Sequence, residues 1–261
     1  MIKVENVSKE FRLSKEQRKE HPTNDKYTLA VNNLSFSCNP GEVFSLLGPN
    51  GAGKTTTLRM LSTILQPSSG KIEICGVDAV KYPREARRKI GFLTGSTGLY
   101  ARLSANEVID YFASLYNVPN NVLKERKAYL YDLLNMNEFA SKKIGKMSTG
   151  MKQKVSICRT MIHDPEVLIL DEPTSGLDVI AAEGIIQLIR DYKSQNKTVL
   201  FSSHIMGEVD LLSDRLAIIH NGTLKHQGTM AEFRADMEGQ SLTGAFINIV
   251  QSWYLKFSEK N

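Results

Sequence analysis

The sequence has 261 residues, 41% of them apolar and 23% charged, which fits one large or two small soluble domains with a sizeable buried core. No apolar run reaches the ~20 residues that a membrane-spanning helix needs, and the amino terminus lacks a signal-peptide core, so we expect a cytoplasmic protein. The net charge of +5 is mild, and three scattered cysteines without a CxxC pair favour a reducing compartment over a metal cluster.

Two alternating segments, residues 2–7 and 29–37, are the first predicted strands, and we expect them to pair with each other. Residues 10–27 between them are rich in charged and amide side chains, contain Pro22 and show no apolar periodicity. We interpret this stretch as a surface loop that is partly helical. Because its charges nearly balance, it does not indicate a nucleic-acid-binding arm, and we expect no nucleic-acid partner.

A glycine-rich turn after the apolar run 43–47 carries the clearest functional signal. It reads GPNGAGKTT, fits the phosphate-binding pattern G-x-x-x-x-G-K-[ST], and precedes a helical pattern over residues 55–65. Such a strand, turn and helix bring main-chain N–H groups and a helix N-terminus against phosphate oxygens. Lys54 is expected to reach the β- and γ-phosphates and Thr55 to offer its hydroxyl to Mg²⁺. The predicted nucleotide-binding residues are Gly48, Pro49, Asn50, Gly51, Ala52, Gly53, Lys54, Thr55 and Thr56.

Between about residues 95 and 157 the pattern is mainly helical, which we interpret as a helical subdomain inserted into an α/β core. Ser104 and Glu107 form a capping-box signature at the start of one helix, and another helix follows Ser148. The other predicted elements are strands at 71–75, 89–93, 167–170, 198–202 and 216–220 and helices at 123–134, 180–192 and 205–212. Strands that alternate with helices imply a parallel sheet covered on both faces. We assign residues 1–238 to this domain and expect residues 239–261 to form a helical tail.

Two acids end the all-apolar run 167–170, at the edge of a parallel sheet where ligands bind. Asp171 could hold Mg²⁺ directly or through water, and Glu172 could polarise a water aimed at the γ-phosphate. Acids that merely cap the next turn are the alternative, which the phosphate loop in the same chain disfavours. His204 ends the following strand and could hydrogen-bond the γ-phosphate, although a histidine at a strand end is often structural.

The segment MSTGMKQK, residues 147–154, is a Ser/Gly turn that enters a helix N-terminus, which is a second arrangement suited to anions. Alone it indicates only a helix cap. The phosphate loop of the same chain cannot easily use it across the helical block. A second copy of the chain, facing the first head to tail, could supply it.

In order, GPNGAGKTT, STGMKQK, LILDEPTSGLD and SSH resemble the motifs of the ATP-binding subunits of ABC transporters, over essentially residues 1–235. The resemblance implies a P-loop NTPase core with a mostly parallel sheet, a small antiparallel β-subdomain and an inserted α-helical subdomain. It also implies that two copies sandwich two ATP molecules. Each ATP would lie between the phosphate loop of one copy and Ser148, Thr149 and Gly150 of the other, with Asp178 near the symmetry axis.

By the same resemblance, Glu172 is the general base and His204 the residue that responds to the γ-phosphate. An aromatic side chain after the first strand would stack on adenine; Phe11 stands at that place, with Tyr27 as a rival because of the long insertion.

Two positions depart from the family pattern. Met147-Ser148-Thr149-Gly150-Met151 stands where the family has LSGGQ, and Thr149 keeps a small polar residue there. Gly95 stands where the family has a glutamine that contacts magnesium and senses the membrane partner. A water or the hydroxyl of Thr94 or Ser96 would have to take that place.

The segments STGMKQK and GFLTGSTGLY are most similar to ATPases of the NatA type, which power sodium extrusion with a separate membrane permease. This implies an ATP-hydrolysing subunit on the cytoplasmic face of the membrane, with ATP and Mg²⁺ as ligands and coupling near residues 95–102. An ATPase of a drug or lipid exporter is one alternative. A nucleotide-gated clamp of DNA repair or of ribosomes is another, disfavoured because long heptads and a second ATPase unit are absent.

Overall fold

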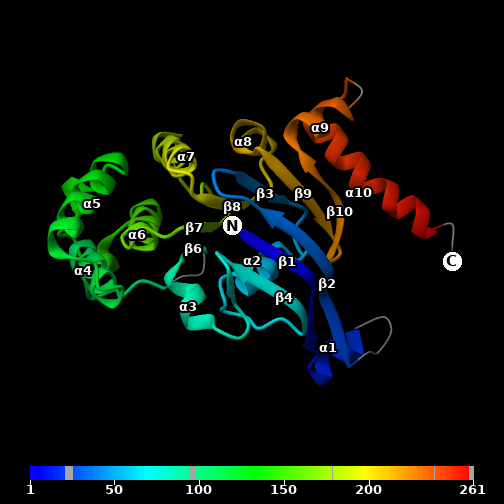
Figure 1. The fold of residues 1–261 in the computed structure, drawn as a ribbon, viewed down its shortest axis with the longest axis horizontal. Helices are drawn as coiled ribbons and strands as arrows, with labels where there is room; N and C mark the ends of the chain where they lie inside the picture. Colours follow the sequence, from blue (N-terminus) through cyan, green and yellow to red (C-terminus); the bar gives the residue numbers. More distant parts are fainter. Residues whose placement is uncertain (21–25, 95–97, 178, 238, 259–261) are drawn as a thin grey trace.

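The computed structural model describes the chain apart from residues 21–25, 95–97, 178, 238 and 259–261, and its strands form two sheets (Figure 1). The large sheet has the strand order β10-β9-β3-β8-β7-β6 and the small sheet the order β2-β1-β4-β5. The large sheet consists of β3 (Val43–Leu47), β6 (Ile90–Leu93), β7 (Val167–Asp171), β8 (Thr198–Ser203), β9 (Arg215–His220) and β10 (Thr223–Thr229). The small sheet consists of β1 (Ile2–Arg12), β2 (Tyr27–Cys38), β4 (Ser69–Ile74) and β5 (Val77–Asp78).

The large sheet is parallel from β9 to β6, and only β10 pairs antiparallel. Its central strand β3 is buried along its whole length, as the all-apolar run predicts for a sheet covered on both faces. Val43 and Leu47 pack into one core cluster, whereas Phe44 and Leu46 pack into the other. The large sheet is therefore the shared wall of two cores.

The small sheet is antiparallel, and its β1–β2 hairpin confirms the predicted pairing of the first two strands. Both strands run further than expected, however, because Glu10 pairs with Leu29 and Arg12 with Tyr27. The assignment of all of residues 10–27 to a surface loop was therefore wrong at its two ends, although α1 (Lys15–Glu20) confirms its helical part. Register shifts within β1 interrupt the alternation of buried and exposed side chains, so these residues show no strand pattern.

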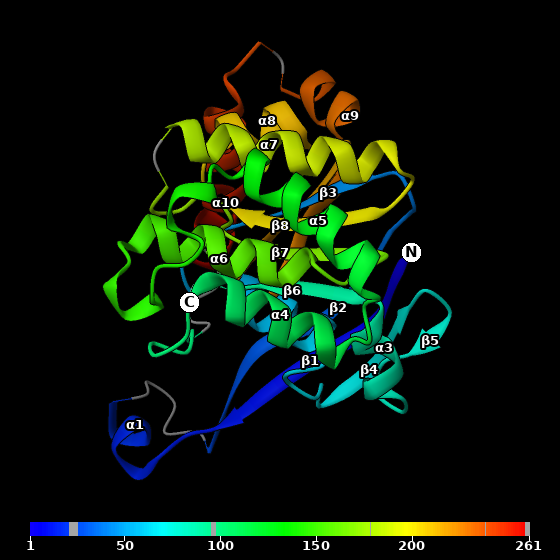
Figure 2. The same cartoon turned by 90° about the vertical axis from the view of Figure 1, so that its left-hand side faces the viewer.

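Helices surround the two sheets, and one group of them is set apart beside β6 (Figures 1 and 2). A helical block beside β6 consists of α4 (Ala105–Leu115), α5 (Asn120–Leu133) and α6 (Thr149–Met161). The other helices are α2 (Lys54–Leu61), which lies between the two sheets, and α3 (Pro83–Arg88), α7 (Val179–Ser194), α8 (Met206–Leu212), α9 (Met230–Ala235) and α10 (Leu242–Ser258). None of the described helices is both long and apolar enough to cross a bilayer.

Helix α4 begins with the predicted capping box, whose hydrogen bonds fix the first turn of the helix. The Ser104 hydroxyl accepts from the Glu107 N–H at 3.3 Å, and the Glu107 carboxylate accepts from the Ser104 N–H at 2.7 Å. At the carboxyl end of the chain, α10 packs against α8 and β10, with Leu242 and Ala245 against the core cluster, as expected of a helical tail.

Each core contains one fully buried thiol. Cys38 belongs to the cluster between the two sheets, and Cys158 to the cluster beneath the helical block. Burial raises the pKa of both thiols well above the ordinary value. Both side chains therefore behave as small apolar groups in the folded chain.

Candidate active site

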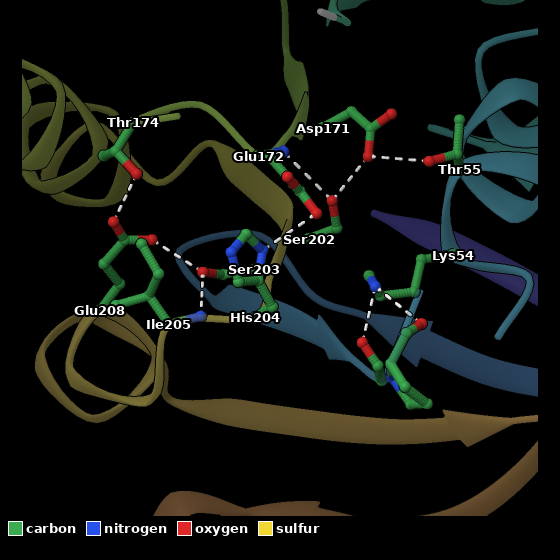
Figure 3. Close-up of polar contacts among 12 residues, drawn as sticks. Lys54, Thr55, Asp171, Glu172, Thr174, Ser202, Ser203, His204, Ile205 and Glu208 are labelled. Atoms are coloured by element: carbon green, nitrogen blue, oxygen red, sulfur yellow. Dashed lines mark hydrogen bonds and ion pairs between the residues drawn. The ribbon is translucent and has the colours of Figure 1, made fainter. Parts of the chain in front are cut away.

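Three loops meet at the carboxyl edge of the large sheet (Figure 3). Strands β3, β7 and β8 are parallel neighbours, so the loops that follow them begin at the same edge. The register pairs Leu47 with Ser203 and Asp171 with Ser202, which brings the three strand ends level. The glycine-rich turn, the acidic pair and the predicted histidine consequently lie together.

The glycine-rich turn needs glycine at two points where the chain passes close to other backbone. A Cβ atom on Gly48 would lie 2.3 Å from the carbonyl oxygen of Ile219, and one on Gly53 would lie 2.7 Å from that of Ala30. Gly53 also has a φ of 103°, in the region that side chains disfavour. Helix α2 begins directly after it without a side-chain cap, so its first N–H groups are available to an anion.

The other predicted loop residues complete this turn. Ala52 is buried, and its N–H donates to the Pro49 carbonyl at 3.1 Å, whereas Asn50 and Gly51 are exposed. Thr56 is half-buried in the first turn of α2. The turn thus presents main chain rather than large side chains at its surface, as phosphate binding requires.

Lys54 lies over the turn, with its side chain buried. Its ammonium donates to the carbonyl oxygens of Gly48 at 2.6 Å and Pro49 at 3.1 Å. Burial lowers the pKa of Lys54, and the nearby carboxylates of Glu172 and Asp171 oppose that shift. The side-chain nitrogen of Lys54 therefore lies where the turn and both acids converge.

A cluster of oxygen atoms surrounds Asp171 at the foot of the turn. The Thr55 hydroxyl donates to its carboxylate at 3.3 Å, and the Ser202 hydroxyl donates to the same oxygen at 2.7 Å. Hydroxyl and carboxylate oxygens beside a phosphate site suit Mg²⁺, which takes few protein ligands and completes its shell with phosphate and water. Sequence reasoning missed Ser202, whose only signal is its place beside His204 at the end of a buried strand.

Glu172 and His204 face each other across the edge of the sheet (Figure 3). The imidazole Nδ1 of His204 lies 3.1 Å from the Glu172 carboxylate, and both side chains are partly exposed. The Glu172 N–H donates to the main-chain and hydroxyl oxygens of Ser202 at 3.2 and 3.1 Å. A carboxylate positioned beside an imidazole is an arrangement suited to general-base activation of a water.

Ser148, Thr149 and Gly150 lie at the start of α6 in the helical block. The Ser148 hydroxyl caps the helix by accepting from the Met151 N–H at 3.2 Å. A Cβ atom on Gly150 would meet nothing within 4 Å, so this face is open. Within the described residues, no hydrogen bond joins this turn to the phosphate loop, and its predicted use of ATP rests on a second copy.

Phe11 and Tyr27, the two candidates for stacking on adenine, lie on opposite strands of the β1–β2 hairpin and are both exposed. The Lys9 ammonium lies 5.3 Å from the centre of the Phe11 ring. Both aromatic residues stay candidates. Gly95, Ser96 and Asp178 lie outside the described residues.

A glycine-rich turn between a parallel strand and a helix, with acids at the end of a neighbouring strand, defines a P-loop nucleotide-binding protein. The family model described as ABC transporter matches residues 31–175, and a model described as AAA domain, putative AbiEii toxin, Type IV TA system matches residues 143–210. The ABC transporter ATP-binding protein NatA of Bacillus subtilis is 40% identical over 224 residues, which cover 85% of this chain and 91% of that protein. The chain belongs to the ABC transporter family and is an ATP-binding, ATP-hydrolysing subunit of it.

Further similarities agree with this assignment. The bacitracin transport ATP-binding protein BcrA of Bacillus licheniformis is 40% identical over 197 residues, 75% of this chain and 63% of that protein. A solved ATP-binding subunit of an ABC transporter has a TM-score of 0.84 at 26% identity, covering 95% of this chain and 99% of that one. A dimeric, post-hydrolysis ATP-binding cassette bound to ADP and Pi shares the fold, with a TM-score of 0.77 at 24% identity over 88% of this chain and 99% of that one. The predicted family and fold class are confirmed.

Proposed function

We propose that this chain powers an ABC exporter, working as a head-to-tail dimer beneath a separate membrane permease. The observation that carries the proposal is the convergence of the phosphate turn, the Asp171 oxygen cluster and the Glu172–His204 pair at one edge of the sheet. These groups supply the cation, metal ligands, base and imidazole that hydrolysis of a γ-phosphate uses.

In this proposal the main-chain N–H groups of the turn and Lys54 bind the phosphates. The Thr55 hydroxyl and the Asp171 carboxylate would hold Mg²⁺, which would offset the charge that develops on the phosphate oxygens. The Glu172 carboxylate orients a water and accepts its proton. His204 positions that carboxylate and hydrogen-bonds the γ-phosphate.

The second half of each ATP site would come from a partner copy through Ser148, Thr149, Gly150 and Asp178. The exposed start of α6 supports this, because its open N-terminal turn can approach an anion on another molecule. The dimeric cassette that shares the fold adds support from outside the chain.

We propose that the permease docks at the cleft between the helical block and the core. The cleft is a cavity of about 360 Å³ whose lining includes Phe92, Tyr100, Phe112 and Arg159. Large apolar side chains around the helical block are exposed, among them Tyr100 at 53% and Leu115 at 56%. Exposed aromatic and aliphatic groups beside a cavity are typical of protein interfaces. Phe92 lies on β6, which pairs with the strand that carries Asp171, so docking can influence the ATP site.

Sodium is the proposed cargo, on the resemblance to NatA-type ATPases. The relative named for linearmycin resistance, 32% identical over 255 residues and 98% of this chain, and the bacitracin transport relative favour an antibiotic as second candidate. The test is ATPase activity in proteoliposomes with and without the permease of the adjacent gene, in sodium and in potassium. Stimulation by sodium alone supports sodium export, and stimulation by linearmycin or bacitracin instead supports antibiotic export. A chain that shows no ATPase activity, with the permease or without it, would contradict the proposal.

A further inference from the structure

Two loops of the candidate site continue beyond the last paired residues of β7 and β8. A carboxylate other than those of Asp171 and Glu172 connects them there. The loop after β7 carries Glu172 and continues to Leu177, and the loop after β8 carries His204. The β7–β8 ladder ends at the pair of Asp171 with Ser202. The next main-chain contact joins the loop after β7 to strand β8, where the Glu172 N–H donates to the Ser202 carbonyl at 3.2 Å.

The third carboxylate is that of Glu208, in the first turn of α8 (Figure 3). One of its oxygens accepts a hydrogen bond from the Thr174 hydroxyl, in the loop after β7. The other accepts from the Ser203 hydroxyl at 2.8 Å, at the end of β8. Ser203 in turn accepts from the Ile205 N–H at 3.0 Å, and its side chain is buried.

We propose that Glu208 is a positioning residue for ATP hydrolysis, which sets the distance between the loop of Glu172 and the loop of His204. One of its oxygens holds Thr174 in the loop after β7, and the other holds Ser203, the strand residue directly before His204. The inference rests on the proposed roles of Glu172 and His204. It adds to them a residue that touches neither the phosphate turn nor the reacting atoms.

We call Glu208 and its hydrogen bonds to Thr174 and Ser203 the brace. The position of the brace predicts which kinetic constant it controls. Lys54, Thr55 and the glycine turn make no hydrogen bond to Thr174, Ser203 or Glu208 in the described chain, so ATP binding should be independent of it. Alignment of the Glu172 carboxylate with a bound water depends on both loops, and small misplacements of catalytic groups lower rates steeply. Loss of the brace should therefore lower kcat and leave KM unchanged.

Gln153 of α6 reaches the same loop, since its side-chain N–H donates to the Pro173 carbonyl at 3.4 Å. Among the residues that the structure describes, the loop is thus held from the side of the helical block by Gln153 and from α8 by Glu208. If α6 moved relative to the sheet, Gln153 would pull on the loop that carries Glu172, and the hydrogen bond from Thr174 to Glu208 would resist that movement.

The test compares near-isosteric variants with a matched control on the same helix. Glu208→Gln keeps the shape but has one acceptor oxygen in place of two, and Thr174→Val removes the hydroxyl donor. Both should lower kcat for ATP by roughly 10- to 100-fold with KM within about 2-fold of wild type. Thr174→Ser, which keeps the hydroxyl, should restore kcat. Asp210→Ala removes an exposed carboxylate of α8 that pairs with Arg234 instead, and it should leave both constants unchanged.

Several outcomes would overturn the inference. Unchanged kcat in Glu208→Gln and Thr174→Val would remove the brace from the mechanism, as would no rescue by Thr174→Ser. A loss shared equally by Asp210→Ala, or accompanied by a matching loss of thermal stability, would assign Glu208 to the stability of α8. Glu172→Gln in the same series distinguishes failure of the inference about Glu208 from failure of the proposed hydrolysis site. Only an active Glu172→Gln protein would contradict the hydrolysis site itself.

Discussion

Glu172 combines an uncommon backbone conformation with a side chain directed at His204. Its φ of 50° lies in the left-handed region, which is unfavourable for a side chain of this size and concentrates at functional sites. Because an amide cannot accept the proton of an attacking water, Glu172→Gln should bind ATP yet hydrolyse it ~100-fold more slowly or worse. Nucleotide binding and phosphate release measured on the same preparation check this. Turnover near that of wild type would place the base on another group, with His204 the first candidate.

His163 gives the chain a stability that depends on pH. Burial beside the stacked Tyr116 ring lowers the pKa of His163 to about 4, against an ordinary value near 6.5. The unfolded chain binds this proton near pH 6.5 and the folded chain only near pH 4. As pH falls through that window the unfolded state therefore binds more protons, and the folded state loses stability.

We expect this group to lower the free energy of unfolding by roughly 2 kcal/mol between pH 7 and pH 5. His163→Gln removes the titrating ring, so its stability should fall less over the same interval. Urea unfolding at both pH values measures the difference. Equal slopes for the two proteins would show that another group is responsible.

Among the elements, α4 offers a direct test of its capping box. Ser104→Ala removes the acceptor of the Glu107 N–H and should lower the free energy of unfolding by about 1 kcal/mol. Ser114 is the matched control, because its exposed hydroxyl only donates to a carbonyl near the other end of the same helix. Denaturant unfolding of Ser114→Ala should differ little from wild type. A control loss as large as that of Ser104→Ala would contradict a specific role for the cap.

Elements with strong local patterns were predictable from the sequence, and elements that depend on neighbours were not. The strands of the parallel sheet are short apolar runs, and the phosphate turn has fixed residue types. By contrast β10 is partly buried with polar side chains and packs at an edge, so nothing in its composition indicates a strand. Helix α9 was missed although Thr229 and Glu232 form a capping box like that of α4.

The candidate active site divides in the same way. Lys54, Asp171, Glu172 and His204 could be found because each stands next to a recognisable strand or turn. Ser202 contacts Asp171, and Glu208 contacts Thr174, each about thirty residues away in the sequence. These contacts form only when β7 and β8 lie side by side. Pairing across the sheet, rather than local pattern, determines these contacts.

At the scale of the whole molecule, the proposed function predicts a dimer that depends on ATP. Glu172→Gln saturated with ATP should form dimers in light scattering, because slow hydrolysis leaves both nucleotides in place between the copies. Adding Lys54→Ala, which removes the main cation of the phosphate turn, should return the protein to monomers. A Glu172→Gln protein that stays monomeric with bound ATP, also beside its permease, would contradict the head-to-tail arrangement.

The two buried thiols can serve as chemical probes of local opening in the two cores. An alkylating reagent reacts with the thiolate, so Cys38 and Cys158 can be modified only when the surrounding side chains part. Since one thiol lies on each side of the large sheet, the two labelling rates report separately how often each side opens. Equal labelling rates would mean that the two cores open together in one cooperative unfolding event. Faster labelling of Cys158 would mean that the core beneath the helical block opens locally while the other core stays folded.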